Sequence, residues 1–280
     1  MNNKTVKIND IEFNNTSEIK LICGPCQIES QSHAFSMCEK IKNISEALEM
    51  KFVFKSSYDK ANRTSHKSPR GVGMEEGLKI LEKIKKEFSC LVLTDVHEPK
   101  QCQMVSKIVD IIQIPAFLCR QTDLLLAAGK TNRVINIKKG QFMSPWEMNS
   151  VTEKILSTGN DKILITERGT MFGYNNLVTD IRGISIMKKI GFPVIFDATH
   201  SVQLPGSNRN TSGGQREFVE ILAKAAVTVG ISSIFLETHQ DPDNAPSDGA
   251  NMIPLSDLSR ILSEIKLYDK LTKSIRNKNV

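Results

Sequence analysis

The sequence lacks a long apolar segment, a block of like charges and a low-complexity tract. No apolar run approaches the roughly 18 residues that a membrane-spanning helix needs. The polar start MNNKTVKIND does not resemble a secretory signal peptide. We therefore expect no membrane partner and a cytoplasmic protein. Because no linker divides the chain, we also expect a single domain over residues 1–280.

Aromatic residues and net charge are also modest. Basic residues exceed acidic ones by 37 to 31 and are spread along the chain, and only three Tyr and one Trp are available for stacking on bases. These features argue against a nucleic-acid partner and favour small anionic ones. The six cysteines lie in the first half at irregular spacing, which in a chain without an export signal indicates reduced thiols.

Short apolar runs recur along the chain, and each is followed by a loop and then a helical pattern. Such runs, rich in Ile and Val, are typical of strands that are buried on both faces. Eight runs are present, at residues 20–23, 52–55, 91–94, 111–114, 134–137, 163–166, 194–196 and 234–236. Helices are expected at residues 30–50, 74–88, 147–157, 177–190, 214–229 and 256–272.

This alternation predicts an α/β protein with a closed (β/α)₈ TIM barrel. A doubly wound sheet is the alternative. Ahead of the first run, VKINDIEF at residues 6–13 predicts a β-hairpin that turns at Asn9-Asp10. We expect this hairpin, within residues 1–15, to cap the bottom of the barrel.

Polar residues stand at nearly all of the expected strand ends, where barrels collect their chemistry. They are Cys26, Lys55, Lys60, Asp95, His97, Gln113, Lys138, Glu167, Arg168, Asp197, His200, Glu237 and His239. A single polar residue at such a place needs no function, because the chain is meeting water there. The combination of Lys, Arg, His, Cys, Asp and Glu has the ingredients of a phosphate-binding, metal-assisted site.

The string Cys23-Gly-Pro-Cys26 has two interpretations. It is also the redox motif of thioredoxins, so a dithiol oxidoreductase is an alternative function. Against this, no aromatic residue precedes Cys23, and strand alternation places Cys23 within the strand and Cys26 past its end. Cys26 is then either a metal ligand or a small buried hydrophobe.

Four residues could together bind a metal ion. Cys26, His200, Glu237 and Asp248 supply a thiolate, an imidazole and two carboxylates from the first, seventh and eighth strands, which become neighbours when a barrel closes. A buried His or a strand-end Glu can equally be structural, so this set alone is only suggestive.

The chain resembles the 3-deoxy-D-manno-octulosonate 8-phosphate synthase family over about residues 19–262. The matching strings are GPCQIES (24–30), FKSSYDKANRT (54–64), TDVH (94–97), QIPAFLCRQT (113–122), KKGQFM (138–143), ERGTMFGY (167–174), FDATH (196–200) and ETHQDPDNAPSD (237–248). The resemblance implies a transferase, 3-deoxy-8-phosphooctulonate synthase, of lipopolysaccharide biosynthesis. It condenses phosphoenolpyruvate with D-arabinose 5-phosphate and water, and it is typically a homotetramer.

The resemblance also assigns residues to substrates. Phosphoenolpyruvate would be bound by Lys55, Lys60, Gln113, Ala116, Lys138 and Arg168, the last two on its phosphate, with His200 also at the substrate. Arabinose 5-phosphate would be bound by Asn62, Arg63 and Thr64, with Phe117 and Arg120 near a subunit contact. The catalytic candidates are Lys60, Asp95, His97 and Glu237, and His97 is preferred for proton transfer because its unperturbed pKa is near neutrality.

The residue at position 26 indicates the subclass. Metal-dependent members of the family have Cys there, with His, Glu and Asp at the positions of His200, Glu237 and Asp248, whereas metal-independent members have Asn. The resemblance therefore implies a divalent transition metal, either Zn, Fe, Mn or Co.

The sequence departs from the family in two places. The family usually has Ser at Thr64, and the string from His66 to Arg70 differs more widely, so the local loop shape is an open question.

The nearest alternative function is that of a 3-deoxy-arabino-heptulosonate 7-phosphate synthase, which uses erythrose 4-phosphate. That enzyme typically has Pro-Arg-Thr after the lysine, whereas this chain has Ala-Asn-Arg-Thr after Lys60. Loops 203–214 and 241–251 are expected to close over bound substrates.

Overall fold

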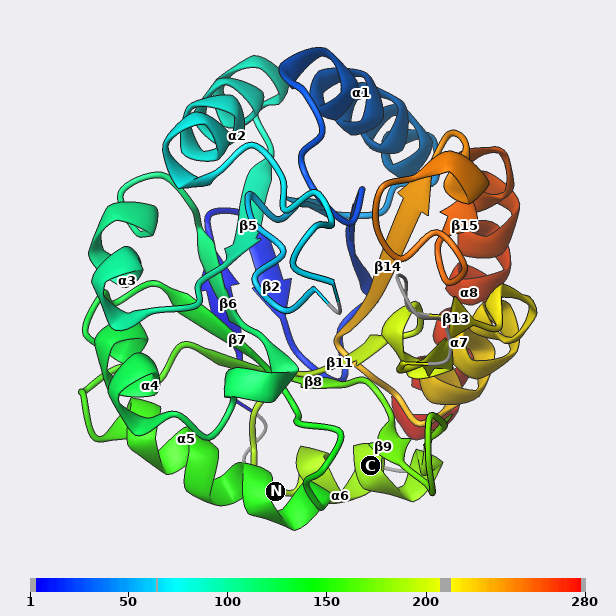
Figure 1. The fold of residues 1–280 in the computed structure, drawn as a ribbon. Helices are drawn as coiled ribbons and strands as arrows, with labels where there is room; N and C mark the ends of the chain where they lie inside the picture. The colour runs from blue at the N-terminus through cyan, green and yellow to red at the C-terminus, as the bar shows by residue number, and fades with distance from the viewer. Residues whose placement is uncertain (1–3, 64, 207–212, 278–280) are drawn as a thin grey trace.

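The computed structural model describes residues 4–63, 65–206 and 213–277 and has a barrel of parallel strands at its centre (Figure 1). The eight barrel strands are β3 (Lys20–Gly24), β4 (Phe52–Lys55), β5 (Leu91–Asp95), β6 (Ile111–Ile114), β7 (Val134–Lys138), β8 (Ile163–Glu167), β11 (Val194–Asp197) and β14 (Ser233–His239). Each strand pairs in parallel with the next, and β14 pairs with both β11 and β3. The ring is therefore closed, which confirms the (β/α)₈ prediction over the doubly wound sheet.

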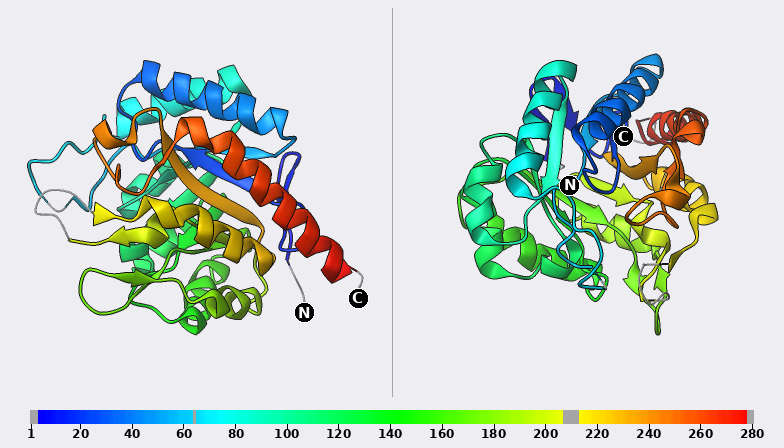
Figure 2. Two further views of the ribbon diagram at one scale, coloured as in Figure 1. Left: turned by 90° about the vertical axis from the view of Figure 1, so that its right-hand side faces the viewer. Right: turned by 45° about the horizontal axis from the view of Figure 1, so that its top comes forward.

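Helices surround the barrel in every view (Figure 1, Figure 2). They are α1 (Gln31–Ala47), α2 (Met74–Phe88), α3 (Pro99–Val105), α4 (Thr122–Gly129), α5 (Met148–Leu156), α6 (Ile181–Lys188), α7 (Val219–Thr228) and α8 (Leu255–Asn277). Within the described residues, no helix is both long enough and apolar enough to cross a bilayer.

Shorter elements decorate the loops. Two antiparallel pairs join β9 (Thr170–Met171) with β10 (Leu177–Val178), and β12 (Gln203–Leu204) with β13 (Gly213–Gly214), while β15 (Ile253–Pro254) lies parallel to β14. Five single turns of 3₁₀-helix are η1 (Ala116–Leu118), η2 (Pro145–Glu147), η3 (His200–Val202), η4 (Arg216–Phe218) and η5 (Pro242–Asn244).

The strands have two buried faces because alternate side chains enter different cores. On β5, Leu91 and Leu93 belong to the cluster inside the barrel, and Val92 belongs to the cluster between the strands and the helices. Burial on both faces explains why the runs are apolar without interruption. Each expected run lies inside an observed strand. Several strands extend one residue further, onto polar residues such as Asp95, Lys138 and Glu167.

Two expected helices begin too early. The helix expected at 214–229 begins as α7 at Val219, because Gly214 pairs in β13 and residues 216–218 form η4. Residues 177–190 were predicted as helical, but Leu177 and Val178 form β10 and α6 begins at Ile181. Asp180 is the reason, because its side chain accepts the backbone N–H of Arg182 and caps the helix there. The helices α3 and α4 were not predicted, since stretches of seven and eight residues are too short to show a clear periodicity.

The N-terminal hairpin closes the barrel at the end opposite the polar strand ends. β1 (Val6–Ile8) and β2 (Ile11–Phe13) pair antiparallel, and Asn9 in the turn has a positive φ of 51°. Their inward side chains pack with the first residues of β5, β6 and β7 in the inner cluster. The predicted cap at the bottom of the barrel is confirmed.

Gly24, at the end of β3, is required by the close approach of β4. A Cβ at this position would lie 1.9 Å from the carbonyl oxygen of Lys55. We expect Gly24→Ala to reduce the free energy of unfolding by about 3 kcal/mol, since overpacked backbone must shift. Urea unfolding measures this. Gly183→Ala in α6 is the control, because its Cβ would meet no atom closer than 3.6 Å. Equal midpoints for Gly24→Ala and the native chain would contradict the expectation.

Candidate active site

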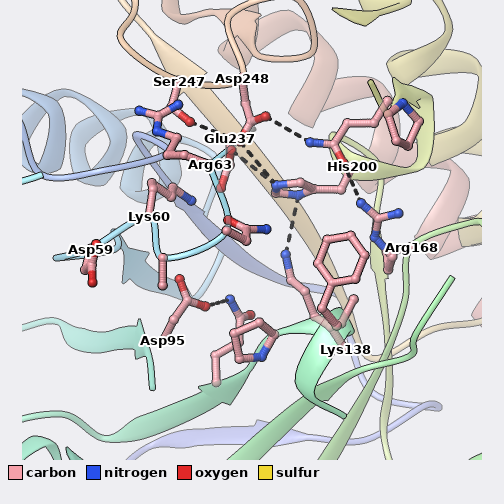
Figure 3. A pocket seen from close by; sticks show the side chains of 18 of the residues that line it. Asp59, Lys60, Arg63, Asp95, Lys138, Arg168, His200, Glu237, Ser247 and Asp248 are labelled. Carbon is pink, nitrogen blue, oxygen red and sulfur yellow. Dashed lines mark hydrogen bonds and ion pairs between the residues drawn. The ribbon is translucent and has the colours of Figure 1, made fainter. Parts of the chain in front are cut away.

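A cavity of about 780 Å³ opens at the carboxyl ends of the barrel strands (Figure 3). Its walls come from the loops after most of the strands. The predicted residues that line it are Lys55, Lys60, Asn62, Arg63, Asp95, His97, Gln113, Ala116, Phe117, Lys138, Arg168, His200, Glu237 and Asp248. Cys26 is buried and contacts Asp248, while Thr64 lies outside the described residues.

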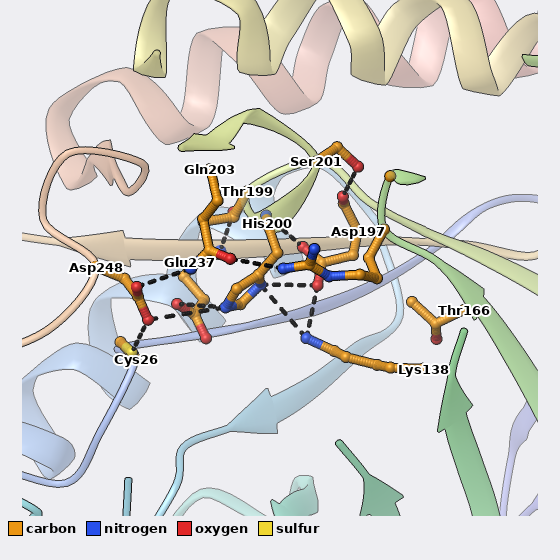
Figure 4. A network of polar contacts seen from close by, with 12 residues as sticks. Cys26, Lys138, Thr166, Asp197, Thr199, His200, Ser201, Gln203, Glu237 and Asp248 are labelled. Carbon is orange, nitrogen blue, oxygen red and sulfur yellow. Dashed lines mark hydrogen bonds and ion pairs between the residues drawn. The ribbon is translucent and has the colours of Figure 1, made fainter. Parts of the chain in front are cut away.

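The four proposed metal ligands converge at one side of this cavity (Figure 4). Atoms of Cys26, Glu237 and Asp248 lie within 4.8 Å of one another, and the Cys26 Sγ is 2.9 Å from Asp248 Oδ2. His200 Nε2 is 3.6 Å from Glu237 Oε2 and 3.8 Å from Asp248 Oδ2. The barrel closure predicted from the sequence therefore brings together Glu237 of β14 and residues from the loops that follow β3, β11 and β14.

Asp197 determines how His200 faces this cluster. Asp197 Oδ1 accepts the backbone N–H of His200, and Asp197 Oδ2 lies 2.8 Å from His200 Nδ1. An ionised carboxylate only accepts hydrogen bonds, so we assign the proton of neutral His200 to Nδ1. The lone pair of Nε2 then faces Glu237 and Asp248. Asp197 thus both caps the turn and orients the imidazole.

The donor set fits a divalent transition metal. Glu237 is fully buried, and its Oε2 has no hydrogen-bond partner among the described residues although it faces an imidazole nitrogen. A buried carboxylate oxygen without a partner is unfavourable unless a cation or a proton compensates for it. One thiol, one imidazole and two carboxylates at this spacing are ligands that Zn²⁺, Fe²⁺, Mn²⁺ and Co²⁺ accept.

Lys55 neutralises the other oxygen of Glu237. Its Nζ donates to Glu237 Oε1 at 2.5 Å and to the carbonyl oxygen of Cys26 at 2.9 Å, and both side chains are buried. Burial raises the pKa of Glu237, but the charges of Lys55, Lys60 and Lys138 outweigh it and hold this pKa far below the usual range. Glu237 is therefore an anion at neutral pH.

Two further cations bound the floor and wall of the cavity. Lys138 Nζ donates to Asp197 Oδ2 at 2.6 Å and lies 4.0 Å from the centre of the Phe235 ring. Arg168 is almost completely buried, and its Nη1 has no partner within the described residues, whereas Nη2 donates to Gln203 at 2.6 Å. An unpaired buried guanidinium nitrogen at a cavity wall is suited to an anionic ligand.

A chain of hydrogen bonds crosses the top of the barrel and ends on Asp95. Thr166 donates to Asn136, Asn136 donates to Gln113, and Gln113 together with Ser57 donates to Asp95. Burial raises the pKa of Asp95, but Lys55 and Lys60 lower it further than burial raises it. Asp95 is thus a rigidly held anion, whereas burial lowers the pKa of neighbouring His97 below its ordinary value.

The loop after β4 forms a further part of the cavity rim. Arg63 donates to Gln27 Oε1 and to the carbonyl oxygen of Pro246, both at 2.9 Å, and so joins this loop to the loop after β14. The divergent segment 66–70 folds back, because Arg70 pairs with Asp59 and its carbonyl oxygen accepts the N–H of Lys60. Phe117 is 50% exposed at the rim.

Some polar groups of this region were not anticipated. Gln203, which bridges Arg168 and Asp248, carries no sequence signal beyond its place three residues after His200. A second group, Glu29, His33 and His239, also has donor atoms within 4.8 Å of one another. There His239 Nδ1 accepts the N–H of Asp241, so neutral His239 carries its proton on Nε2 and donates to Glu29 at 2.8 Å. His239 and Glu29 of this second group therefore form a hydrogen-bonded pair.

Cys23 and Cys26 occupy different environments. Cys23 is fully buried in the core between strands and helices, whereas Cys26 contacts Asp248. Burial raises the pKa of both thiols, and for Cys26 the nearby carboxylates raise it further. A redox dithiol needs an accessible, low-pKa cysteine, so this geometry argues against the oxidoreductase alternative.

The barrel and its cavity define a class: a (β/α)₈ protein in which Lys55, Lys60, Arg63, Lys138 and Arg168 line a cavity at the carboxyl ends of the strands, beside a group of possible metal ligands. The sequence pattern of the DAHP synthetase I family matches residues 3–274, and the chain belongs to this family. It is 57% identical to a 2-dehydro-3-deoxyphosphooctonate aldolase of Bartonella quintana over 98% of both chains. It is 58% identical to that of Bartonella henselae over 97% of both chains, and 54% identical to that of Brucella anthropi over 98% of this chain and 99% of the other.

Proposed function

We propose that this chain is a 3-deoxy-8-phosphooctulonate synthase, which converts phosphoenolpyruvate, D-arabinose 5-phosphate and water into 3-deoxy-D-manno-octulosonate 8-phosphate and phosphate. The observation that carries the proposal is a single cavity. In it the buried side chains of Lys55, Lys138 and Arg168 lie beside the possible metal ligands Cys26, Glu237 and Asp248. The full-length identity to relatives named 2-dehydro-3-deoxyphosphooctonate aldolase supports the same activity.

The lysine and arginine side chains offset the repulsion between the two anionic substrates. Phosphoenolpyruvate carries a phosphate and a carboxylate, and the sugar brings a second phosphate, so the anions repel one another in a dry cavity. We assign the phosphate of phosphoenolpyruvate to Arg168 and Lys138, and the sugar phosphate to Arg63 and Asn62. All four residues line the cavity. Each charge-assisted hydrogen bond would contribute roughly 1.5–3 kcal/mol.

In the reaction, C3 of phosphoenolpyruvate forms a bond to the aldehyde carbon of the sugar, and water adds at C2. The intermediate then loses phosphate when the C2–O bond breaks. Burial lowers the pKa of Lys60, but the charges of Glu237, Asp95 and Asp248 raise it by more, so Lys60 keeps its proton and serves as a cationic contact for the substrates. Asp95, His97 and Glu237 are the candidates for moving the remaining protons.

Cys26, His200, Glu237 and Asp248 would hold the divalent ion, which supplies Lewis acidity toward a substrate or water oxygen when it is bound. Asp197 holds His200 in the tautomer that such a ligand needs. We propose that the loops at 203–214 and 241–251 exclude water from the bound substrates. Residues 207–212 of the first loop lie outside the described residues.

We further propose a single-domain cytoplasmic protein that assembles as a homotetramer. Phe117, Phe142 and Trp146 are among the exposed large apolar side chains, and we assign Phe117 at the cavity rim to a subunit contact. Sedimentation analysis of the native chain measures the assembly state.

The choice of sugar tests the proposed activity directly. We expect phosphate release from phosphoenolpyruvate to be faster with arabinose 5-phosphate than with erythrose 4-phosphate. The reason is that Ala-Asn-Arg-Thr follows Lys60, whereas the heptulosonate enzymes typically have Pro-Arg-Thr after this lysine, and Asn62 goes with the five-carbon sugar. Phosphate release at equal concentrations of the two sugars provides the comparison. Faster turnover with erythrose 4-phosphate would assign the chain to the heptulosonate reaction.

The pH profile tests the role of His97. Burial lowers the pKa of His97 below its usual 6.5, so the imidazole is neutral at pH 7 and becomes charged only as the pH falls below that value. We expect an acidic limb in kcat/KM below pH 6.5 that His97→Asn removes. Ionisation of the substrates affects both proteins alike. An identical acidic limb in the variant would exclude His97 as the proton-transfer group.

A further inference from the structure

Gln203 lies between the cationic wall of the cavity and the candidate metal ligands (Figure 4). It is the first residue of β12, and its side chain is part of the cavity lining. Its Oε1 accepts a hydrogen bond from Arg168 Nη2 at 2.6 Å, and its Nε2 donates to Asp248 Oδ1 at 2.9 Å. One amide therefore connects two groups that the proposed function assigns to different ligands.

The chemistry of both neighbours requires an amide at this position. A guanidinium can only donate hydrogen bonds, and an ionised carboxylate can only accept them. The partner between them must offer an acceptor at one end and a donor at the other, which the Gln203 amide does. A carboxylate at residue 203 would satisfy Arg168 but repel Asp248, and an apolar side chain would leave both buried groups without this partner.

The bridge engages only one terminal atom of each neighbour. Arg168 Nη1 is buried and has no hydrogen-bond partner among the described residues. Asp248 Oδ2 lies 2.9 Å from Cys26 Sγ and 3.8 Å from His200 Nε2. Gln203 thus occupies Nη2 and Oδ1, and the remaining atoms are Nη1, to which the proposed function assigns the phosphate, and Oδ2, to which it assigns the cation.

We propose that Gln203 is a positioning residue that couples binding of the phosphoenolpyruvate phosphate at Arg168 to binding of the divalent cation at Asp248. The inference rests on the proposed function. A cation that fixes Asp248 also fixes the amide, and the amide then holds the guanidinium in the orientation that presents Nη1. Because such a coupling is reciprocal, phosphoenolpyruvate must raise the affinity for the metal by the same factor.

Binding measurements on the full-length protein test this coupling without turnover, since phosphoenolpyruvate alone does not react. The affinity for Zn²⁺ is measured by competition with a chromogenic chelator, with and without phosphoenolpyruvate. The affinity for phosphoenolpyruvate is measured by calorimetry on the metal-free and the Zn²⁺-loaded protein. The proteins are the native chain, Gln203→Met, Gln203→Glu and, as a matched control, Leu204→Met at the next residue of β12.

In the native chain we expect Zn²⁺ to tighten phosphoenolpyruvate binding by about 5-fold or more. Gln203→Met should weaken both ligands and reduce the coupling factor at least about threefold, with direct attraction between the cation and the anion accounting for what remains. Gln203→Glu can accept from Arg168 but cannot donate to Asp248, so it should reduce the coupling factor as Gln203→Met does. Leu204→Met should behave as the native chain.

Two results would overturn the inference. One is a native coupling factor in Gln203→Met, and the other is a native coupling factor in Gln203→Glu. Both would leave the proposed function intact, because the native chain would still bind both ligands. A native chain that binds neither Zn²⁺ nor phosphoenolpyruvate would refute the proposed function and this inference together.

Discussion

Removal of divalent cations is expected to abolish the condensation, and a transition metal such as Zn²⁺, Fe²⁺, Mn²⁺ or Co²⁺ is expected to restore it. The thiol of Cys26 and the carboxylates of Glu237 and Asp248 lie within 4.8 Å of one another, and Glu237 Oε2 has no hydrogen-bond partner among the described residues. Phosphate release before and after chelation, together with metal content by mass spectrometry, is the measurement. Full activity in rigorously metal-free protein would contradict the metal-dependent subclass.

Cys26→Asn provides the matched variant for this experiment. The amide keeps a comparable volume but removes the sulfur ligand, which should weaken metal binding and relax the dependence of activity on metal. Cys119→Ser is the control, because Cys119 is buried beside Met143, outside the donor cluster. Unchanged metal content in Cys26→Asn would exclude Cys26 as a ligand.

Arg168→Ala is expected to lose roughly 2–5 kcal/mol of binding or transition-state stabilisation, by analogy with loss of one partner of a buried charge pair. This corresponds to a decrease in kcat/KM for phosphoenolpyruvate of roughly 30-fold to several thousandfold. The reason is that Arg168 lines the cavity, is only 5% exposed, and has a buried Nη1 without a hydrogen-bond partner among the described residues.

Steady-state kinetics with phosphoenolpyruvate as the varied substrate measure this effect. Arg182→Ala is the control, since the Arg182 side chain is 88% exposed and pairs with Asp180 at the start of α6. Near-native kinetics in Arg168→Ala would remove Arg168 from the phosphate site. Equal losses in both variants would point to a general effect on charge.

The sequence predicted the barrel well because both faces of its strands are buried. The run at 91–94, for example, alternates between two apolar cores, so nothing polar interrupts it until Asp95. The four candidate metal ligands, Cys26, His200, Glu237 and Asp248, were also predicted, since parallel strands place their carboxyl ends at one edge. Their observed convergence follows from the pairing of β14 with β3 and β11.

What the sequence could not predict depends on contacts between loops. The bridge from Gln203 to Arg168 and Asp248 joins residues 35 and 45 positions apart, and a glutamine in a polar loop has no periodicity to mark it. The start of α6 was misplaced because a capping Asp180 outweighs the apolar residues Leu177 and Val178 before it. Such outcomes are decided by hydrogen bonds that exist only after folding.

The neighbouring positions of β3 and β14 have a consequence for biosynthesis of the chain. Lys20 is in register with Ser233, so the earliest barrel strand keeps an unpaired edge until the ribosome has released almost the entire polypeptide. An exposed strand edge invites pairing with other chains, and contacts between such distant residues form slowly. Nascent chains of this protein should therefore depend on chaperones, and premature termination before β14 should yield insoluble fragments.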